Sequence, residues 1–173
     1  MNKKDFSRNC LSQALIELLE DHEYEDISIQ DIVDRAGFSR MAYYRNFKNK
    51  DEVIDYALDN LFNGFIKETH LSFKSMGIEK FIETLFRWFA TDEIVNLTKL
   101  FISRHLVGHM YIQFIKRAQG GFMPNQSQYF YDYIAGGIFS VFVSWVLNGL
   151  KETPEEMAKE ALHFSEIIKS KKE

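Results

Sequence analysis

The chain has 173 residues, of which 46% are hydrophobic and 27% are charged, and its formal net charge is −4. This composition supports a buried core and excludes an intrinsically disordered chain. The single cysteine, Cys10, excludes an intrachain disulfide and a cysteine-based zinc site, which favours a reducing compartment. The first ten residues, MNKKDFSRNC, lack the apolar core of a secretion signal, so we expect a cytoplasmic protein.

Helices are expected throughout the chain, because only two prolines interrupt it and apolar residues recur with a helical period. The longest apolar run, residues 134–147, is shorter than the about 20 residues that span a bilayer, so it predicts a buried helix and no membrane partner. Ser28, Ser39 and Thr153 occupy N-cap positions. In chain order, the expected helices are residues 5–22, 29–35, 40–47, 50–71, 78–90, 92–118, 126–150 and 154–170, and the segment 92–118 is long enough to be two.

Residues 28–47 have the pattern of a helix-turn-helix. A short helix ends before Gly37, whose backbone freedom suits a tight turn, and a second short helix begins near Arg40. The segment from Arg35 to Lys50 carries five cations and no acid, whereas residues 1–60 carry eight Lys or Arg against thirteen Asp or Glu. Positive charge focused on the second helix favours DNA binding. The pattern is also compatible with an ordinary helix pair that has a solvated basic face.

The stretch SIQDIVDRAGFSRMAYYRNFKNKDEVI closely resembles the DNA-binding signature of the TetR/AcrR family of bacterial transcriptional regulators. The resemblance covers about residues 10–55. It implies an all-α protein of about nine helices, with a three-helix DNA-binding domain at 1–50 and a larger effector-binding and dimerisation domain at 51–173. The features that match the family are Ile32, Ala36-Gly37, Ser39, Tyr44, Phe47, Lys50 and Val53-Ile54.

The resemblance also implies which residues contact DNA. Tyr44 and Lys50 match positions that meet phosphates in the family, and Tyr43 matches an inward, packing position. By the chemistry of base edges, Arg40 suits guanine, Asn46 suits adenine and Met41 suits a thymine methyl group. The full expected set is Ser28, Gln30, Ser39, Arg40, Met41, Tyr44, Arg45, Asn46, Lys48 and Lys50.

One departure concerns the start of the second helix. Many family members have Gly-Thr where this chain has Met41-Ala42, so the threonine hydroxyl that often meets a phosphate is missing. The operator sequence therefore cannot be taken over from a relative.

The C-terminal part is rich in aromatic residues, which predict a helical core or an apolar effector pocket between helices. His105 and His109 are four positions apart, so on one helix they would share a face; a metal pair is the less favoured alternative to polar pocket or surface histidines. We expect no metal and no cofactor. The expected pocket residues are Trp88, Phe101, His105, His109, Phe114 and Phe142.

A small-residue face recurs every four positions along the penultimate helix, which permits close approach of another helix. Packing within one subunit is the alternative to a two-fold dimer interface. The resemblance supports the dimer, because the family pairs through its last two helices. The expected interface residues are Gly136, Ser140, Ser144, Met157, Ala161, Phe164 and Ile168.

These observations predict a ligand-responsive one-component regulator, a repressor that binds a palindromic operator as a homodimer and is released by a small molecule. The alternative is a TetR-like co-activator or a regulator that binds a protein partner and does not act by operator release. An enzyme is not expected, since the sequence has no glycine-rich phosphate loop and no defensible Ser-His-Asp set.

Overall fold

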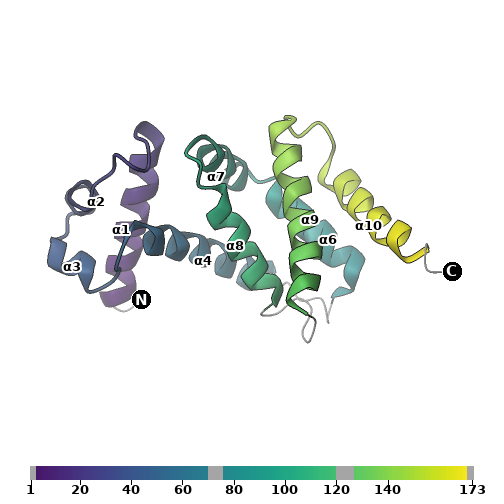
Figure 1. The fold of residues 1–173 in the computed structure, drawn as a ribbon, viewed down its shortest axis with the longest axis horizontal. Helices are drawn as coiled ribbons and strands as arrows, with labels where there is room; N and C mark the ends of the chain where they lie inside the picture. Colours follow the sequence, from purple (N-terminus) through teal and green to yellow (C-terminus); the bar gives the residue numbers. More distant parts are fainter. Residues whose placement is uncertain (1–2, 70–75, 120–126, 171–173) are drawn as a thin grey trace.

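The computed structural model describes residues 3–69, 76–119 and 127–170, with side chains described as far as residue 163. Within these ranges the chain forms α-helices and no strand, which confirms the all-α prediction. The helices, labelled in Figure 1, are α1 Lys3–Asp21, α2 Ile29–Ala36, α3 Arg40–Tyr44, α4 Lys50–Thr69, α6 Ile78–Phe89, α7 Asp92–Ser103, α8 Val107–Arg117, α9 Gln128–Leu147 and α10 Pro154–Ser170.

The first three helices gather at one end of an elongated molecule (Figure 1). α2 begins with a reciprocal capping box, in which the Ser28 hydroxyl accepts from the Asp31 amide and the Asp31 carboxylate accepts from the Ser28 amide. It ends at Gly37, whose φ of 71° lies in the left-handed region that favours glycine. The Ser39 hydroxyl then caps α3. Local capping chemistry thus sets both ends of the turn.

α4 joins this unit to the rest of the molecule, because it packs against α1 near its start and against α8 further along. Its buried face carries Val53, Ile54, Leu58, Phe62 and Phe65. Burial of these side chains ties the two ends of the protein to one continuous hydrophobic cluster.

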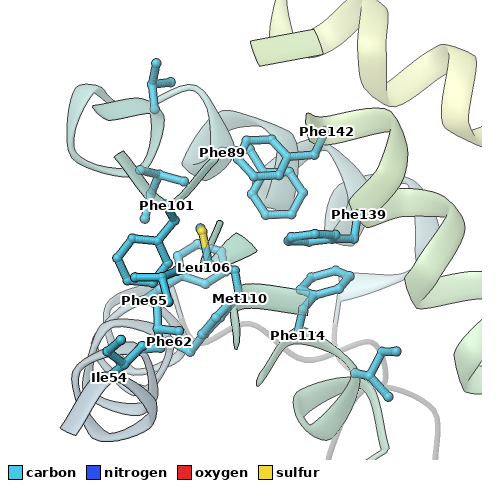
Figure 2. Packing of buried hydrophobic residues seen from close by; sticks show 14 of the residues in the cluster. Ile54, Phe62, Phe65, Phe89, Phe101, Leu106, Met110, Phe114, Phe139 and Phe142 are labelled. Atoms are coloured by element: carbon cyan, nitrogen blue, oxygen red, sulfur yellow. The ribbon is translucent and has the colours of Figure 1, made fainter. Parts of the chain in front are cut away.

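The C-terminal core is dominated by aromatic rings (Figure 2). Phe89 of α6 stacks on Phe142 of α9, with ring centroids 4.1 Å apart, and Phe114 of α8 lies between Phe62 of α4 and Phe139 of α9. α10 packs against α6, and α9 packs against α7 and α8. Most of the apolar residues predicted from the sequence pattern are therefore buried in contacts between these helices.

One helix of the candidate DNA-binding segment is shorter than predicted, whereas the prediction that the segment 92–118 could be two helices is confirmed. α3 ends at Tyr44 rather than at residue 47, and the backbone turns so that the Phe47 amide donates to the Tyr43 carbonyl. The segment 92–118 is two helices, because the chain leaves α7 at Arg104 and His105 has a φ of 58°. His105 lies in this turn and His109 lies in α8, so the prediction that they share one helix face was wrong.

α9 is long and apolar enough to cross a membrane by length and composition, with a mean hydropathy of 1.5. It packs in the helical bundle instead, where Tyr131, Ala135, Phe139 and Phe142 are buried against neighbouring helices. The opposite face of α9 is exposed and carries, in order, Tyr129, Tyr133, Gly137, Ser140, Ser144 and Leu147.

Candidate nucleic-acid interface

α3 has a buried side and an exposed side. Ala42 and Tyr43 are buried, whereas Met41 and Tyr44 are 74% and 56% exposed. Arg40 and Arg45 are exposed beside them. A large apolar side chain held in solvent between two arginines indicates a surface shaped for contact with another molecule. Four of the ten residues expected to contact DNA therefore lie together on the outer side of this helix.

Three further residues expected to contact DNA lie in α2 or at the start of α2 and α3. Gln30 is exposed, and its amide donates to the Asp34 carboxylate at 2.7 Å. Ser28 and Ser39 use their hydroxyl oxygens as N-cap acceptors, at 3.2 Å in each case. Hydrogen bonds from Ser28 lower the pKa of the Asp31 carboxyl below its ordinary value. The Ser39 hydroxyl keeps its proton as a donor while it serves as a cap.

Asn46 turns away from the exposed side of α3. Its amide nitrogen donates to the Ala42 carbonyl at 2.7 Å and to the Ser7 hydroxyl at 3.2 Å. Both donor positions of this amide are engaged within the protein. The structure thus places Asn46 at a contact between α1 and α3, and its assignment to adenine stays a prediction without support from this geometry.

Lys50 also makes its contacts within the protein. Its ammonium donates to the carbonyl oxygens of Tyr24 and Ile27, at 2.5 and 2.6 Å, and lies 4.4 Å from the centroid of the Tyr24 ring. The loop between α1 and α2 is therefore fastened to the first turn of α4. Lys48, by contrast, is exposed, with its nearest acid, Glu52, at 3.9 Å.

The platform beneath α3 is aromatic. Tyr43 is fully buried, packs against Phe47, and has a hydroxyl with no hydrogen-bond partner among the described residues. Burial raises the pKa of Tyr43 to about 12. Phe47 in turn packs against Tyr56 of α4. These rings fix the position of α3 relative to α4.

Sequence reasoning missed the part that α1 plays in this platform. The guanidinium of Arg8 lies over the Tyr56 ring at 3.9 Å and over the Phe47 ring at 4.9 Å. The Asn9 side-chain oxygen accepts from the Tyr56 hydroxyl at 2.8 Å. The available signal was that Arg8 falls on the apolar stripe of α1, since a cation within such a stripe is placed to cover aromatic surface.

The C-terminal helices enclose a small apolar cavity of about 30 Å³ between α6, α8 and α9. Phe81, Leu85, Phe114, Tyr131 and Ala135 are among the residues that line it. Of the six residues expected in an effector pocket, Phe114 lines this cavity. Phe101 and Phe142 are buried in the core, and Trp88 stacks on Phe65 with ring centroids 4.2 Å apart.

The two histidines have separate surroundings. His105 is exposed in the turn between α7 and α8. The Nδ1 atom of His109 lies 3.0 Å from the Asp55 carboxylate, and its Nε2 atom lies 3.7 Å from Asp51. The geometric premise of a His105–His109 metal pair is therefore absent, because the two residues do not project from one helix.

The residues expected in the dimer interface differ in exposure. Gly136 faces Tyr111 of α8, and a Cβ atom there would lie 3.3 Å from the tyrosine hydroxyl oxygen, so this glycine serves packing within the subunit. Ser140 and Ser144 are exposed on α9, while Met157 and Ala161 of α10 are half-buried. The side chains of Phe164 and Ile168 lie outside the described residues.

Two family models match the chain. One, described as bacterial regulatory proteins of the tetR family, matches residues 11–57, which include α2 and α3. The other, described as the C-terminal region of transcriptional regulators, matches residues 96–166, from α7 into α10. The two matches therefore cover most of the N-terminal helices and most of the C-terminal helices.

Similar proteins are also found among relatives and solved structures. A TetR transcriptional regulator from Streptococcus agalactiae 2603V has a TM-score of 0.63 at 15% identity, over 94% of each chain. The dihydroxyacetone kinase operon activator DhaS has a TM-score of 0.56 at 17% identity, over 91% of this chain and 93% of that one. In sequence, the dhaKLM operon transcriptional activator DhaS of Lactococcus lactis subsp. lactis (strain IL1403) is 26% identical over 68 residues. That match spans 39% of this chain and 36% of that protein.

Proposed function

Because the chain belongs to the TetR family of bacterial regulatory proteins and is a transcriptional regulator, we propose that it binds a palindromic operator as a homodimer and is released by a small molecule. The observation that carries this proposal is the outer side of α3, where Arg40, Met41, Tyr44 and Arg45 are exposed together on a buried aromatic platform. The buried platform fixes the backbone of α3, so the helix itself needs little reordering when it enters a groove.

DNA contacts are assigned to two groups of residues in this proposal. Gln30, Arg40, Met41, Tyr44, Arg45 and Lys48 are exposed, and we assign base and phosphate contacts to them. Ser39 is assigned a phosphate contact through its hydroxyl proton, and Ser28 is assigned one that replaces its side-chain hydrogen bond to Asp31. Asn46 and Lys50 are assigned indirect roles, since their donors are engaged with Ser7, Ala42, Tyr24 and Ile27.

Dimerisation through α9 and α10 is the second part of the proposal. An apolar helix that leaves Tyr129, Tyr133 and Leu147 exposed is expected to have a partner. A two-fold axis would set two copies of α3 on one side of a duplex, which requires a palindromic site. We retain the division at residue 50, with DNA binding on its N-terminal side and effector binding and dimerisation on its C-terminal side.

Effector binding is assigned to the helices of the C-terminal part, and the cavity lined by Phe81, Leu85 and Phe114 is its starting point. A cavity of about 30 Å³ holds little more than a water molecule, so an effector must displace side chains there. Such displacement would change the position of α8 and hence of α4, on which α8 packs. We place this regulator in the cytoplasm, without catalytic activity and without a membrane partner.

Activation is the second candidate function, as in a TetR-like co-activator or a regulator that binds a protein partner. It is favoured by one specific likeness, because DhaS is by its name an operon activator. Under this alternative the C-terminal surface would hold a partner protein, and operator release would not be the regulatory step.

Selection of bound duplexes from a random DNA pool tests the proposal directly. We expect enrichment of a palindrome, and binding to it should weaken steeply with salt. Arg40→Ala combined with Arg45→Ala should reduce the salt slope by about two units per protomer and relax sequence preference. Lys99→Ala is the control, since Lys99 is an exposed cation of α7, away from α3, α9 and α10 in the sequence. Failure of folded wild-type protein to enrich any sequence at low salt would contradict operator binding and favour the partner-binding alternative.

A further inference from the structure

Arg104, at the end of α7, reaches the end of α1 more than eighty residues earlier in the sequence. Its Nε atom donates to the Leu19 carbonyl at 2.8 Å and its Nη2 atom donates to the Glu20 carbonyl at 2.9 Å. Its Nη1 atom donates to the Glu23 carboxylate at 2.6 Å. The Arg104 side chain is 18% exposed, whereas that of Glu23 is 51% exposed. The planar fork of the guanidinium thus engages three acceptors at once.

The end of α1 needs a cation from elsewhere. The last carbonyl groups of a helix have no intrahelical donor, and negative charge at this end is unfavourable. No basic residue lies in the last turn of α1, and residues 20–26 include five Asp or Glu. Arg104 supplies both the missing donors and the missing positive charge. The two hydrogen bonds to the carbonyl groups cap the end of α1, and they do not need the exposed Glu23 carboxylate.

The turn that carries Arg104 is itself held by the core. The Leu106 amide donates to the Phe101 carbonyl at 2.7 Å, and both residues are buried (Figure 2). Between them His105 takes a left-handed backbone conformation, with a φ of 58°. The direction of Arg104 is thereby set by the packing of α7 and α8, and it changes when they move.

A second set of contacts joins the same helices to α4. Asp51, Asp55 and Asp59 recur every four residues and share one face of α4. His109 of α8 contacts Asp55 at 3.0 Å, and Arg117, two turns further along α8, pairs with Asp59. α8 and its preceding turn therefore hold α4 at one place and α1 at another.

We propose that Arg104 is a positioning residue for DNA binding, which together with the α8–α4 contacts of His109 and Arg117 fixes the N-terminal three-helix unit to the C-terminal helices at two separate points. The three-helix unit packs on α4, so α4 carries it as one body. The second attachment, through Arg104, restricts how that body can tilt relative to α7 and α8. A displacement of α7 and α8 is then passed to α1 as well as to α4. The consequence for DNA binding rests on the proposed function, in which two units bind one palindromic operator.

Amide hydrogen exchange on the full-length protein without DNA tests the attachment itself. In Arg104→Gln, exchange over the last turn of α1 and the following loop, residues 18–27, should become about tenfold faster, since hydrogen bonds to a charged donor are lost. Exchange in α9 should not change. Glu23→Gln should have less than about a twofold effect because that contact is exposed, and Arg87→Gln is the matched control. Wild-type exchange in Arg104→Gln would overturn the proposal.

Binding to a full palindrome and to an isolated half-site separates positioning from simple damage. We expect Arg104→Gln to weaken binding to the full operator about tenfold while leaving half-site affinity unchanged, because one unit alone needs no fixed orientation. Equal weakening on both duplexes would overturn the positioning role. If Arg104→Gln does not fold, Arg104→Lys replaces it, because lysine keeps the positive charge but lacks the planar guanidinium. Weaker binding to the full operator alone would again support the positioning role, and equal weakening on both duplexes would overturn it. If wild type binds neither duplex, the proposed function fails, while the exchange experiment still decides the attachment.

Discussion

The side-chain amide nitrogen of Asn46 lies 3.2 Å from the hydroxyl oxygen of Ser7, so the second residue after α3 is hydrogen-bonded to the first turns of α1. The same amide donates to the Ala42 carbonyl at 2.7 Å. A residue that sequence comparison assigns to the DNA groove is thereby part of the frame that holds α3.

Replacement of Asn46 by alanine tests that reading. We expect Asn46→Ala to lower the free energy of unfolding by about 1 kcal/mol, since two partly buried hydrogen bonds are lost. Operator affinity should fall uniformly across sequences. Met41→Ala, at a side chain that is 74% exposed, is the contrasting variant and should change sequence preference without a loss of stability. A preference change at a single base pair in Asn46→Ala, found by duplex selection, would restore its assignment to a base.

Lys50 should behave as a structural cation. Lys50→Met removes two hydrogen bonds from an ammonium group to the Tyr24 and Ile27 carbonyls, so we expect a loss of about 2 kcal/mol in unfolding free energy. The slope of log affinity against log salt should change little. Lys48→Met is the control, because Lys48 is exposed, and it should flatten the slope by about 0.9 per protomer without altering stability. The opposite pattern in the two variants would mean that Lys50 meets a phosphate.

Tyr43 gives a prediction at alkaline pH. Its hydroxyl is buried without a partner among the described residues, and its pKa is raised to about 12. Because the folded pKa exceeds the ordinary value of 10.0, its contribution is complete below pH 10 and is lost as pH rises towards 12. Burial, and then the hydrogen bond to Asp51, raise the pKa of Tyr24 as well, so both tyrosines act in the same direction.

Tyr43→Phe should therefore be neutral or stabilising by up to about 1 kcal/mol at pH 7, since an unpaired buried hydroxyl is removed. Between pH 10 and 12 the variant should lose stability less steeply than wild type, with the remaining slope coming largely from Tyr24. Denaturant unfolding at several pH values measures both effects. A variant that is destabilised at pH 7 would show that the hydroxyl has a partner in solution.

Gly37 and Gly64 should respond to alanine with opposite signs. A Cβ atom at either position meets nothing within 4 Å, so only backbone conformation distinguishes them. Gly37 has a φ of 71°, and Gly37→Ala should cost about 1 kcal/mol. Gly64 lies inside α4, and Gly64→Ala should stabilise the protein by about 1 kcal/mol. Thermal unfolding compares the two, and equal signs would contradict the conformational explanation.

A charge on the outer face of α9 should disrupt the proposed dimer. Tyr133 is 61% exposed in the middle of that face. In a two-fold interface Tyr133→Glu would bury an unpaired carboxylate from each copy, so we expect dissociation to become at least about 100-fold easier. Asn96→Arg, at an exposed position of α7, is the control. Light scattering over a dilution series measures the change, and an unaltered mass for Tyr133→Glu would exclude this face as the interface.

The all-α class, the N-caps at Ser28 and Ser39 and the turn at Gly37 were predictable from the sequence, because hydrophobic period and capping are local properties. The signature likewise identified the family, and the comparisons confirm that identification. The helical pattern, the caps and the turn depend on residues close together in the sequence, so they can be predicted without the tertiary structure.

Tertiary structure decided which polar side chains remain available. Asn46 and Lys50 were expected to contact DNA, yet each donates to acceptors on another helix or loop, as Arg104 also does. The break between α7 and α8 has the same origin, since residues Phe101 and Leu106 are both drawn into the core and force the backbone at His105 into a left-handed turn. Hydrogen bonds and burial across distant segments carry no periodic signal. They exist only once the helices have packed, and here they separate the exposed side chains of α3 from those whose donors are engaged within the protein.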